Sequence, residues 1–248
     1  MGDVAVQAPE APEQVNSFSR VFGAIFSPKE TFASIGRRPT WIVPVLLICV
    51  LSLAVVALFG HRGGWRPFFE KQLESNSRVQ DMPAEQRAEV LDRVVAFYPK
   101  VIYSIAVISP FVVVLILGAV FLGVFNGLAG ADLKFKTSLA VAAYALSPGI
   151  IRGLLAIVII LAKDPATVDL QNIVASNAAI LLSDHAAKWL VALMRSIDLF
   201  AFWQMILMAI GYHSASPKKL STGAAFAWIF ILYLVIVLAS VGATAAFS

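Results

Sequence analysis

Residues 195–212 read RSIDLFAFWQMILMAIGY, an apolar stretch with two charged residues, Arg195 and Asp198, near its start. The uncharged part, 199–212, extends about 21 Å as a helix at about 1.5 Å per residue, whereas a bilayer core requires about 20 residues. A helix that crosses the membrane here must therefore take Asp198, and with it Arg195, below the lipid surface. Ionisable groups at that depth are costly unless they are paired or hydrated, so each is a candidate functional residue.

The composition of the whole chain is that of a polytopic membrane protein. Of its 248 residues, 59% are hydrophobic and 14% are charged, and the mean hydropathy is +0.83, whereas soluble domains carry about 25% charged residues. The net charge of +4 lies mostly in loops between apolar runs, so we assign it to topology and lipid headgroups and expect no nucleic acid. The single cysteine, Cys49, excludes an intrachain disulfide.

Long apolar runs predict an all-α fold, a polytopic membrane helical bundle with five transmembrane helices plus short amphipathic helices. We place residues 1–16 in a disordered N-terminal tail and residues 17–248 in a single membrane domain. The predicted spans are 41–60, 101–128, 137–162, 189–212 and 220–245.

Two short amphipathic helices are expected ahead of the first span. Helical spacing gives the first of them one apolar stripe, formed by Phe18, Val21, Phe22 and Ile25, and we place this helix along the membrane surface. The segment SPKE at 27–30 predicts the start of the second. These helices either anchor the first span or dock a soluble partner.

Two longer segments, 61–98 and 163–188, separate the spans on the side of the membrane opposite the N-terminus. Residues 61–98 contain an amphipathic helix that begins at Pro83, and it either packs over the outer mouth of the bundle or lies on the headgroups. Residues 173–182 are apolar but too short to cross, which predicts a re-entrant or interfacial helix.

The second span contains a proline and a pair of small residues. Pro110 predicts a kink. Gly123 and Gly127 lie one helical turn apart and allow another helix to approach closely. This pair favours packing within the monomer or dimerisation.

The third span is interrupted by Pro148 and Gly149 and carries Arg152. Pro148 removes the backbone hydrogen bond to the Tyr144 carbonyl, and Gly149 lets the chain bend. Broken helices of this kind line the sites of transporters, and alternatively they are kinks that neighbouring helices fill.

Arg152 and Asp198 are expected at the same depth. Arg152 lies about 22 Å along its span from Thr137, and Asp198 lies about 21 Å along its own from Tyr212, at the rise of an α-helix. We therefore predict an intramembrane polar cluster of Arg152, Asp198 and Arg195 that joins the two spans. The alternatives are a site for an anionic lipid headgroup or solute, and a proton relay.

Basic residues in short loops predict the orientation. They place the N-terminus in the cytoplasm and the C-terminus outside, in a bacterial cytoplasmic membrane. The residues that carry this prediction are Arg37, Arg38, Lys134, Lys136, Lys218 and Lys219.

No pattern of catalytic residues is visible. The histidines, His61, His185 and His213, lack metal-ligand spacing, and the chain has no phosphate-binding glycine loop and no nucleophile elbow. We expect no enzyme activity, no cofactor and no metal.

Four motifs follow one another along the chain: Phe26-Ser-Pro-x-x-x-Phe32, Pro39-Thr-Trp41-x-x-Pro44, the break from Tyr144 to Gly149, and Asp198-x-Phe200-x-x-Trp203 continuing to Gly211. In this order and spacing they resemble the Yip family, in particular its prokaryotic branch. The resemblance covers about residues 18–240.

The resemblance implies a five-helix membrane domain with a cytoplasmic N-terminus. Eukaryotic relatives interact with Rab GTPases in transport between Golgi and endoplasmic reticulum, but their Asp-Leu-Tyr-Gly-Pro motif is absent here, so GTPase binding is not carried over. Our leading hypothesis is a non-enzymatic protein that organises membrane partners or lipids through its N-terminal helices or residues 61–98. The alternative is a transporter or channel for a small solute, ion or lipid that uses the broken third span.

Overall fold

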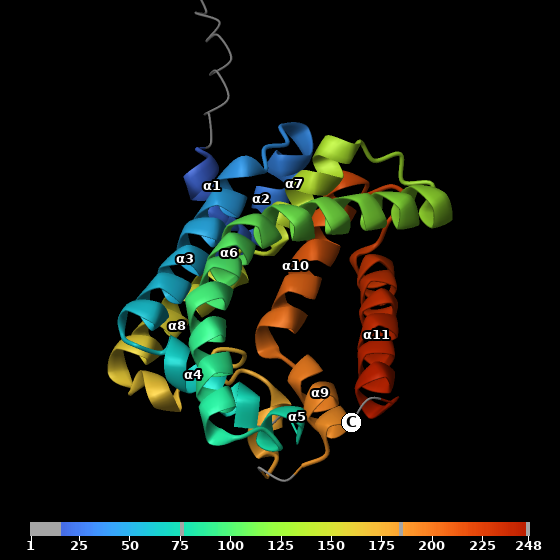
Figure 1. Cartoon of the computed structure of the whole chain (residues 1–248). Coiled ribbons are helices and arrows are strands. Elements are labelled where there is room, and N and C mark those ends of the chain that lie inside the picture. Colours follow the sequence, from blue (N-terminus) through green and yellow to red (C-terminus); the bar gives the residue numbers. More distant parts are fainter. Residues whose placement is uncertain (1–15, 75–76, 184–185, 247–248) are drawn as a thin grey trace, which may run out of the picture.

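The structure, a computed structural model, describes residues 16–74, 77–183 and 186–246, and within them the chain is helical without β-strands (Figure 1). The tail predicted at 1–16 lies outside the described residues, except for Asn16. The α-helices are α1 (Ser17–Phe26), α2 (Pro28–Arg37), α3 (Ile42–His61), α4 (Trp65–Glu74), α5 (Ser77–Gln80), α6 (Ala84–Ala129), α7 (Phe135–Ala145), α8 (Pro148–Ala162), α9 (Lys188–Ser196), α10 (Leu199–Ala215) and α11 (Thr222–Ala246).

In the described part of the chain, four helical segments are long and apolar enough to cross a membrane: α3, α6, the consecutive α7 and α8, and α11. α10 is a shorter apolar helix of 17 residues. The prediction of one continuous helix over 189–212 is wrong, because the chain leaves the helical conformation at Ile197 and Asp198, between α9 and α10. α1 and the end of α11 lie at opposite ends of the bundle, which we call the α1 end and the α4 end (Figure 1).

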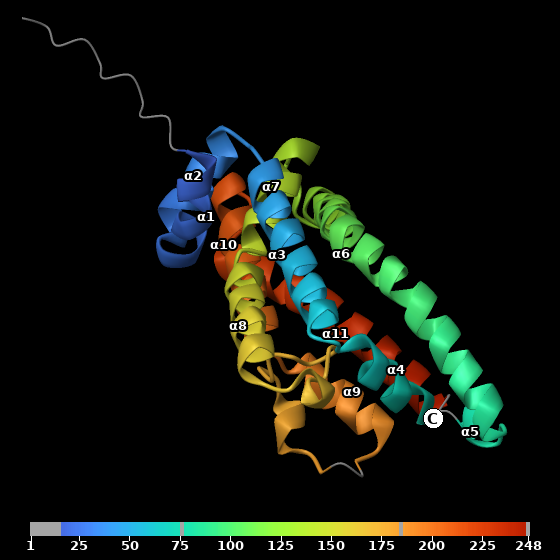
Figure 2. The same cartoon turned by 60° about the vertical axis from the view of Figure 1, so that its left-hand side comes forward.

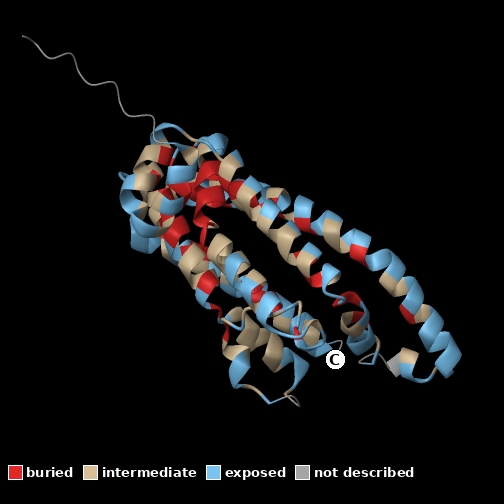
Figure 3. Cartoon of the chain, turned by 90° about the vertical axis from the view of Figure 1, so that its left-hand side faces the viewer, coloured by how far each residue is buried: buried red, intermediate tan, exposed pale blue. Residues whose placement is uncertain are grey.

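Most of the buried residues lie toward the α1 end (Figure 3). Tyr144 and Tyr212 are fully buried there, between α2, α6, α7 and α10. The Ser138 hydroxyl donates to the Gly118 carbonyl at 2.6 Å and lies 2.8 Å from the Tyr212 hydroxyl. A polar contact therefore joins α6, α7 and α10 inside an otherwise apolar core, where an unpaired hydroxyl would be costly.

α6 is a single helix of 46 residues that runs along the length of the molecule (Figure 2). The separate helices predicted at 83–98 and 101–128 are therefore wrong as two elements. Pro99 does not end the helix, because α4 packs across it: Phe69 contacts Tyr98 at 5.9 Å and Trp65 contacts Tyr103 at 6.0 Å between ring centroids. Pro110 also lies inside α6, which bends along its course (Figure 1), as expected where proline removes a helical hydrogen bond.

α6 lies close to α7 at Gly118. A Cβ atom at this position would lie 3.1 Å from Cα of Leu139 on α7. The sequence favours Gly123 and Gly127 for close packing within the monomer or dimerisation, but a Cβ atom added at either position would have no atom of the described chain within 4 Å. Packing within the monomer thus uses a different glycine, and the predicted pair faces open space.

Candidate functional site

The helix break between α7 and α8 is held by Ser147. Because Pro148 has no N–H to donate, the Tyr144 carbonyl loses its helical partner. The Ser147 hydroxyl donates to that carbonyl at 2.7 Å, and the Ser147 N–H donates to it at 3.1 Å. Gly149 N–H then donates to Leu146 at 2.9 Å and starts α8. The break is therefore hydrogen-bonded, and α8, which follows it, packs against α3.

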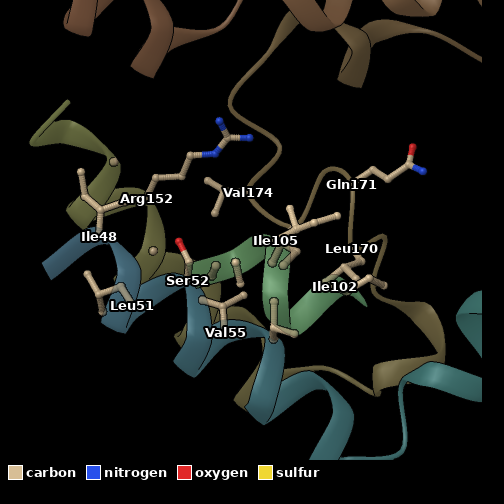
Figure 4. Close-up of a pocket in the computed structure, with 16 residues that line it drawn as sticks. Ile48, Leu51, Ser52, Val55, Ile102, Ile105, Arg152, Leu170, Gln171 and Val174 are labelled. Atoms are coloured by element: carbon tan, nitrogen blue, oxygen red, sulfur yellow. The ribbon is translucent and has the colours of Figure 1, made fainter. Parts of the chain in front are cut away.

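Arg152 lies one turn into α8, inside the candidate span Phe135–Ala162, and lines a cavity of about 350 Å³. α3, α6, α8 and the segment around residues 170–174 line this space, which we call the α8 cavity. Figure 4 shows Arg152 reaching from α8 toward the segment that carries Val174, with Ser52 on the facing side of α3. The described residues offer Arg152 no ion pair and no hydrogen bond.

Asp198 begins α10 as its N-cap residue. Its Oδ1 accepts from the Ala201 N–H at 3.0 Å, which satisfies one of the free donors of the first helical turn. Its Oδ2 accepts from the Ser176 hydroxyl. Asp198 is 6% exposed. Its buried carboxylate is therefore held by two neutral donors, the Ser176 hydroxyl and the Ala201 N–H.

The segment 176–178 also pairs with the α9–α10 break through the backbone. The Ala178 N–H donates to the Ile197 carbonyl, and the Leu199 N–H donates to the Ser176 carbonyl, each at 3.0 Å. These bonds form an isolated antiparallel bridge between Asn177 and Asp198. The backbone groups that the helix break frees are thus satisfied by protein groups.

Arg195 turns away from Asp198 and binds the preceding loop. Its guanidinium pairs with Asp169 at 3.1 Å and donates to the Gln171 amide oxygen at 3.3 Å. Among the described residues, Asp198 forms no ion pair with Arg152 or Arg195, so the direct contacts expected within the polar cluster do not form. The reason is the helix break at Ile197, which changes the direction of the chain between the two residues that helical spacing places together.

The sequence did not identify Asp169, Gln171 and Ser176 as partners of the charged residues. Residues 163–187 show no helical periodicity, and within the described residues the helix predicted at 173–182 is absent apart from one 3-10 turn, Ala178–Leu181. A signal was present for Asp198: an aspartate directly before an apolar run is a common helix start. This signal indicates that Asp198 is a helix N-cap, whereas its charge and its expected depth in the membrane favoured an ion pair.

Within the described residues, the site as a whole presents an unpaired cation, Arg152, beside a largely apolar cavity. These residues also contain no group of three or more His, Cys, Asp or Glu side chains that could hold a metal ion. The cavity offers a ligand the charge of Arg152 and an apolar lining.

One comparison with known proteins gives an assignment. A family model described as the Yip1 domain matches residues 22–243. No curated protein and no solved structure matches the chain at a significant level.

Proposed function

This chain belongs to the Yip1 domain family, and on that premise we propose that it is a non-enzymatic integral membrane protein that organises lipids and partner proteins around its N-terminal helices. The observation that carries the proposal is a row of exposed phenylalanines on α1. Phe18, Phe22 and Phe26 are 52%, 63% and 76% exposed. At a spacing of four residues they share one face of the helix.

The opposite face of α1 docks onto the bundle. Val21 and Ala24 are buried in the main core. Arg20 is 6% exposed and donates to the Arg38 carbonyl at 2.9 Å and to the Thr40 hydroxyl at 3.3 Å. Because this face holds α1 in place, the phenylalanine face points away from the protein at a fixed angle.

We assign the phenylalanine face to the headgroup region of the bilayer. It neighbours α3, whose Ile42, Leu46 and Val50 are also exposed at a spacing of four residues, so the two apolar surfaces belong to adjacent helices. Two exposed basic residues at the C-terminal end of α2, Arg37 and Arg38, supply charges that attract anionic headgroups. Moving each half-exposed ring from water into lipid is worth about 1–2 kcal/mol.

A fluorescent probe tests this assignment directly. In a Cys49→Ala background, a nitrobenzoxadiazole label is attached at Phe22→Cys or, as the matched control, at Lys29→Cys on α2, and the full chain is placed in lipid nanodiscs. We expect a blue-shifted emission protected from iodide at position 22 and a water-like emission at position 29. Equal, water-like emission at both positions would exclude lipid contact by this face.

The organising role itself requires a separate experiment. The tagged wild-type chain and a Phe18→Ser, Phe22→Ser, Phe26→Ser variant are purified from native membranes, and co-purifying proteins and lipids are identified for each. We expect the wild-type chain to retain a defined set that the variant loses. If the wild-type chain retains neither and the reconstituted protein moves a solute, the proposed role is wrong.

Transport is the second candidate, and the α8 cavity is the observation that favours it. A cavity that reaches Arg152 beside a broken span is a feature of transporters. Toward the α1 end, however, Val45, Val114 and Ala143 are fully buried in a cluster formed by α3, α6 and α7. Passage across the membrane would require these helices to separate, and solute flux into proteoliposomes measures whether they do.

A further inference from the structure

The α8 cavity combines an apolar wall with the cationic side chain of Arg152. Leu51 and Val55 of α3 and Ile102 and Ile105 of α6 form its sides (Figure 4). A volume of about 350 Å³ lies within the range of about 300–1,000 Å³ found for ligand sites. The size and the lining suit a hydrocarbon chain better than a hydrated solute.

The charge balance around the cavity leaves Arg152 uncompensated. Asp169 is paired with Arg195, and the Asp198 carboxylate is taken by the Ser176 hydroxyl and the Ala201 N–H. A guanidinium stays protonated at any physiological pH, and inside a membrane span it requires an anion or water. No carboxylate among the described residues meets that requirement for Arg152.

We propose that the α8 cavity binds an anionic acyl lipid, with the phosphate or carboxylate of the lipid on Arg152 and a hydrocarbon chain along α3 and α6. Arg152 contributes the charge and a bidentate geometry that matches either anion. Ser52 of α3 adds a hydroxyl to the lining, whereas the Gln171 amide oxygen is already bound by Arg195. The inference does not depend on the role of α1, which lies at the other end of α3.

Native mass spectrometry of the full chain in a neutral detergent tests the site. The probes are lysophosphatidylglycerol, its zwitterionic counterpart lysophosphatidylcholine, and inorganic phosphate. We expect tighter binding of the anionic lipid than of the zwitterionic one. Arg152→Gln should weaken anionic binding about 10- to 100-fold, the loss expected for one charge-assisted hydrogen bond, and Arg152→Lys should restore part of it.

Two further variants separate the possible outcomes. Arg93→Gln is the matched control, because Arg93 is exposed on α6 and paired with Glu89, and it should bind as the wild type does. Ser52→Phe fills the cavity and leaves Arg152 in place, so it should reduce lipid binding.

Four results would overturn the proposal. The first is equal binding of both lipids. The second is unchanged anionic binding by Arg152→Gln. The third is binding of inorganic phosphate that displaces the lipid and is insensitive to Ser52→Phe, which would indicate a free-anion site. The fourth is loss of lipid binding in Arg93→Gln as well. It would mean that removal of any arginine weakens binding, so that Arg152 has no specific role.

Discussion

Replacing Asp198 with alanine should destabilise the protein through two contacts that the structure defines. Loss of the N-cap bond to Ala201 costs about 1 kcal/mol. Loss of the charge-assisted bond from Ser176, in a residue that is 6% exposed, costs about 1.5–3 kcal/mol. We therefore expect Asp198→Ala to lower the free energy of unfolding by about 2.5–4 kcal/mol.

A graded series of variants measures the two parts separately. Asn is as good an N-cap as Asp, so Asp198→Asn should lose only about 1 kcal/mol. Ser176→Ala removes the second contact alone, so its loss in the free energy of unfolding should lie between those of Asp198→Asn and Asp198→Ala. With about 2–4 °C per kcal/mol for a chain of this size, Asp198→Ala should lower the melting temperature in detergent by about 5–16 °C, measured by tryptophan fluorescence.

Arg152 provides the decisive comparison. Because the structure contains no ion pair between Arg152 and Asp198 among its described residues, the variant Arg152→Gln should change stability little. The double variant with Asp198→Ala should be additive within about 0.5 kcal/mol. A buried ion pair would instead make either single change cost about 3–5 kcal/mol, with strong coupling between them. Coupling of that size, or equal stability of Asp198→Ala and Asp198→Asn, would refute the assignment of Asp198 as a helix cap.

Two other positions lead to sharp expectations. Gly118→Val should lower the melting temperature far more than Gly123→Val on the same helix, because a Cβ at 118 meets the α7 backbone at 3.1 Å whereas one at 123 meets nothing within 4 Å; equal effects would show that the α6–α7 contact is looser than described. Tyr212→Phe removes the contact with Ser138, which keeps its bond to the Gly118 carbonyl, and should lower the free energy of unfolding by about 0.5–1.5 kcal/mol. In a double-mutant cycle, Ser138→Ala combined with Tyr212→Phe should lower it further.

The helical membrane fold follows from the sequence because apolar run length is a strong physical signal. The span predicted at 41–60 differs from α3 by one residue at each end, and the helix predicted from Pro28 is α2. Both have clear boundaries: α3 lies between the polar residues that flank a single apolar run, and α2 begins at a proline in its first turn. Local features of the sequence, the length of an apolar run and a proline in the first turn, were therefore enough to predict where these two helices lie.

The errors arose where contacts between distant segments decide the local structure. Nothing in 196–199 is a strong helix breaker, and the α9–α10 break persists because segment 176–178 satisfies the freed backbone. Conversely, Pro99 is expected to end a helix, but α4 supports α6 on both sides of it. Loop partners such as Gln171 have no periodic pattern, so their positions depend on the folded chain.

The uninterrupted length of α6 has a mechanical consequence. Its 46 residues amount to about 69 Å at the rise of an α-helix, more than twice the thickness of about 30 Å of a hydrocarbon core. No loop separates its polar N-terminal third from the part that contacts α7, so there is no slack to absorb a displacement. A force that tilts the polar third must either move the Gly118 contact with it or bend the helix at Pro99 or Pro110. These two prolines are therefore the positions at which α6 bends most easily.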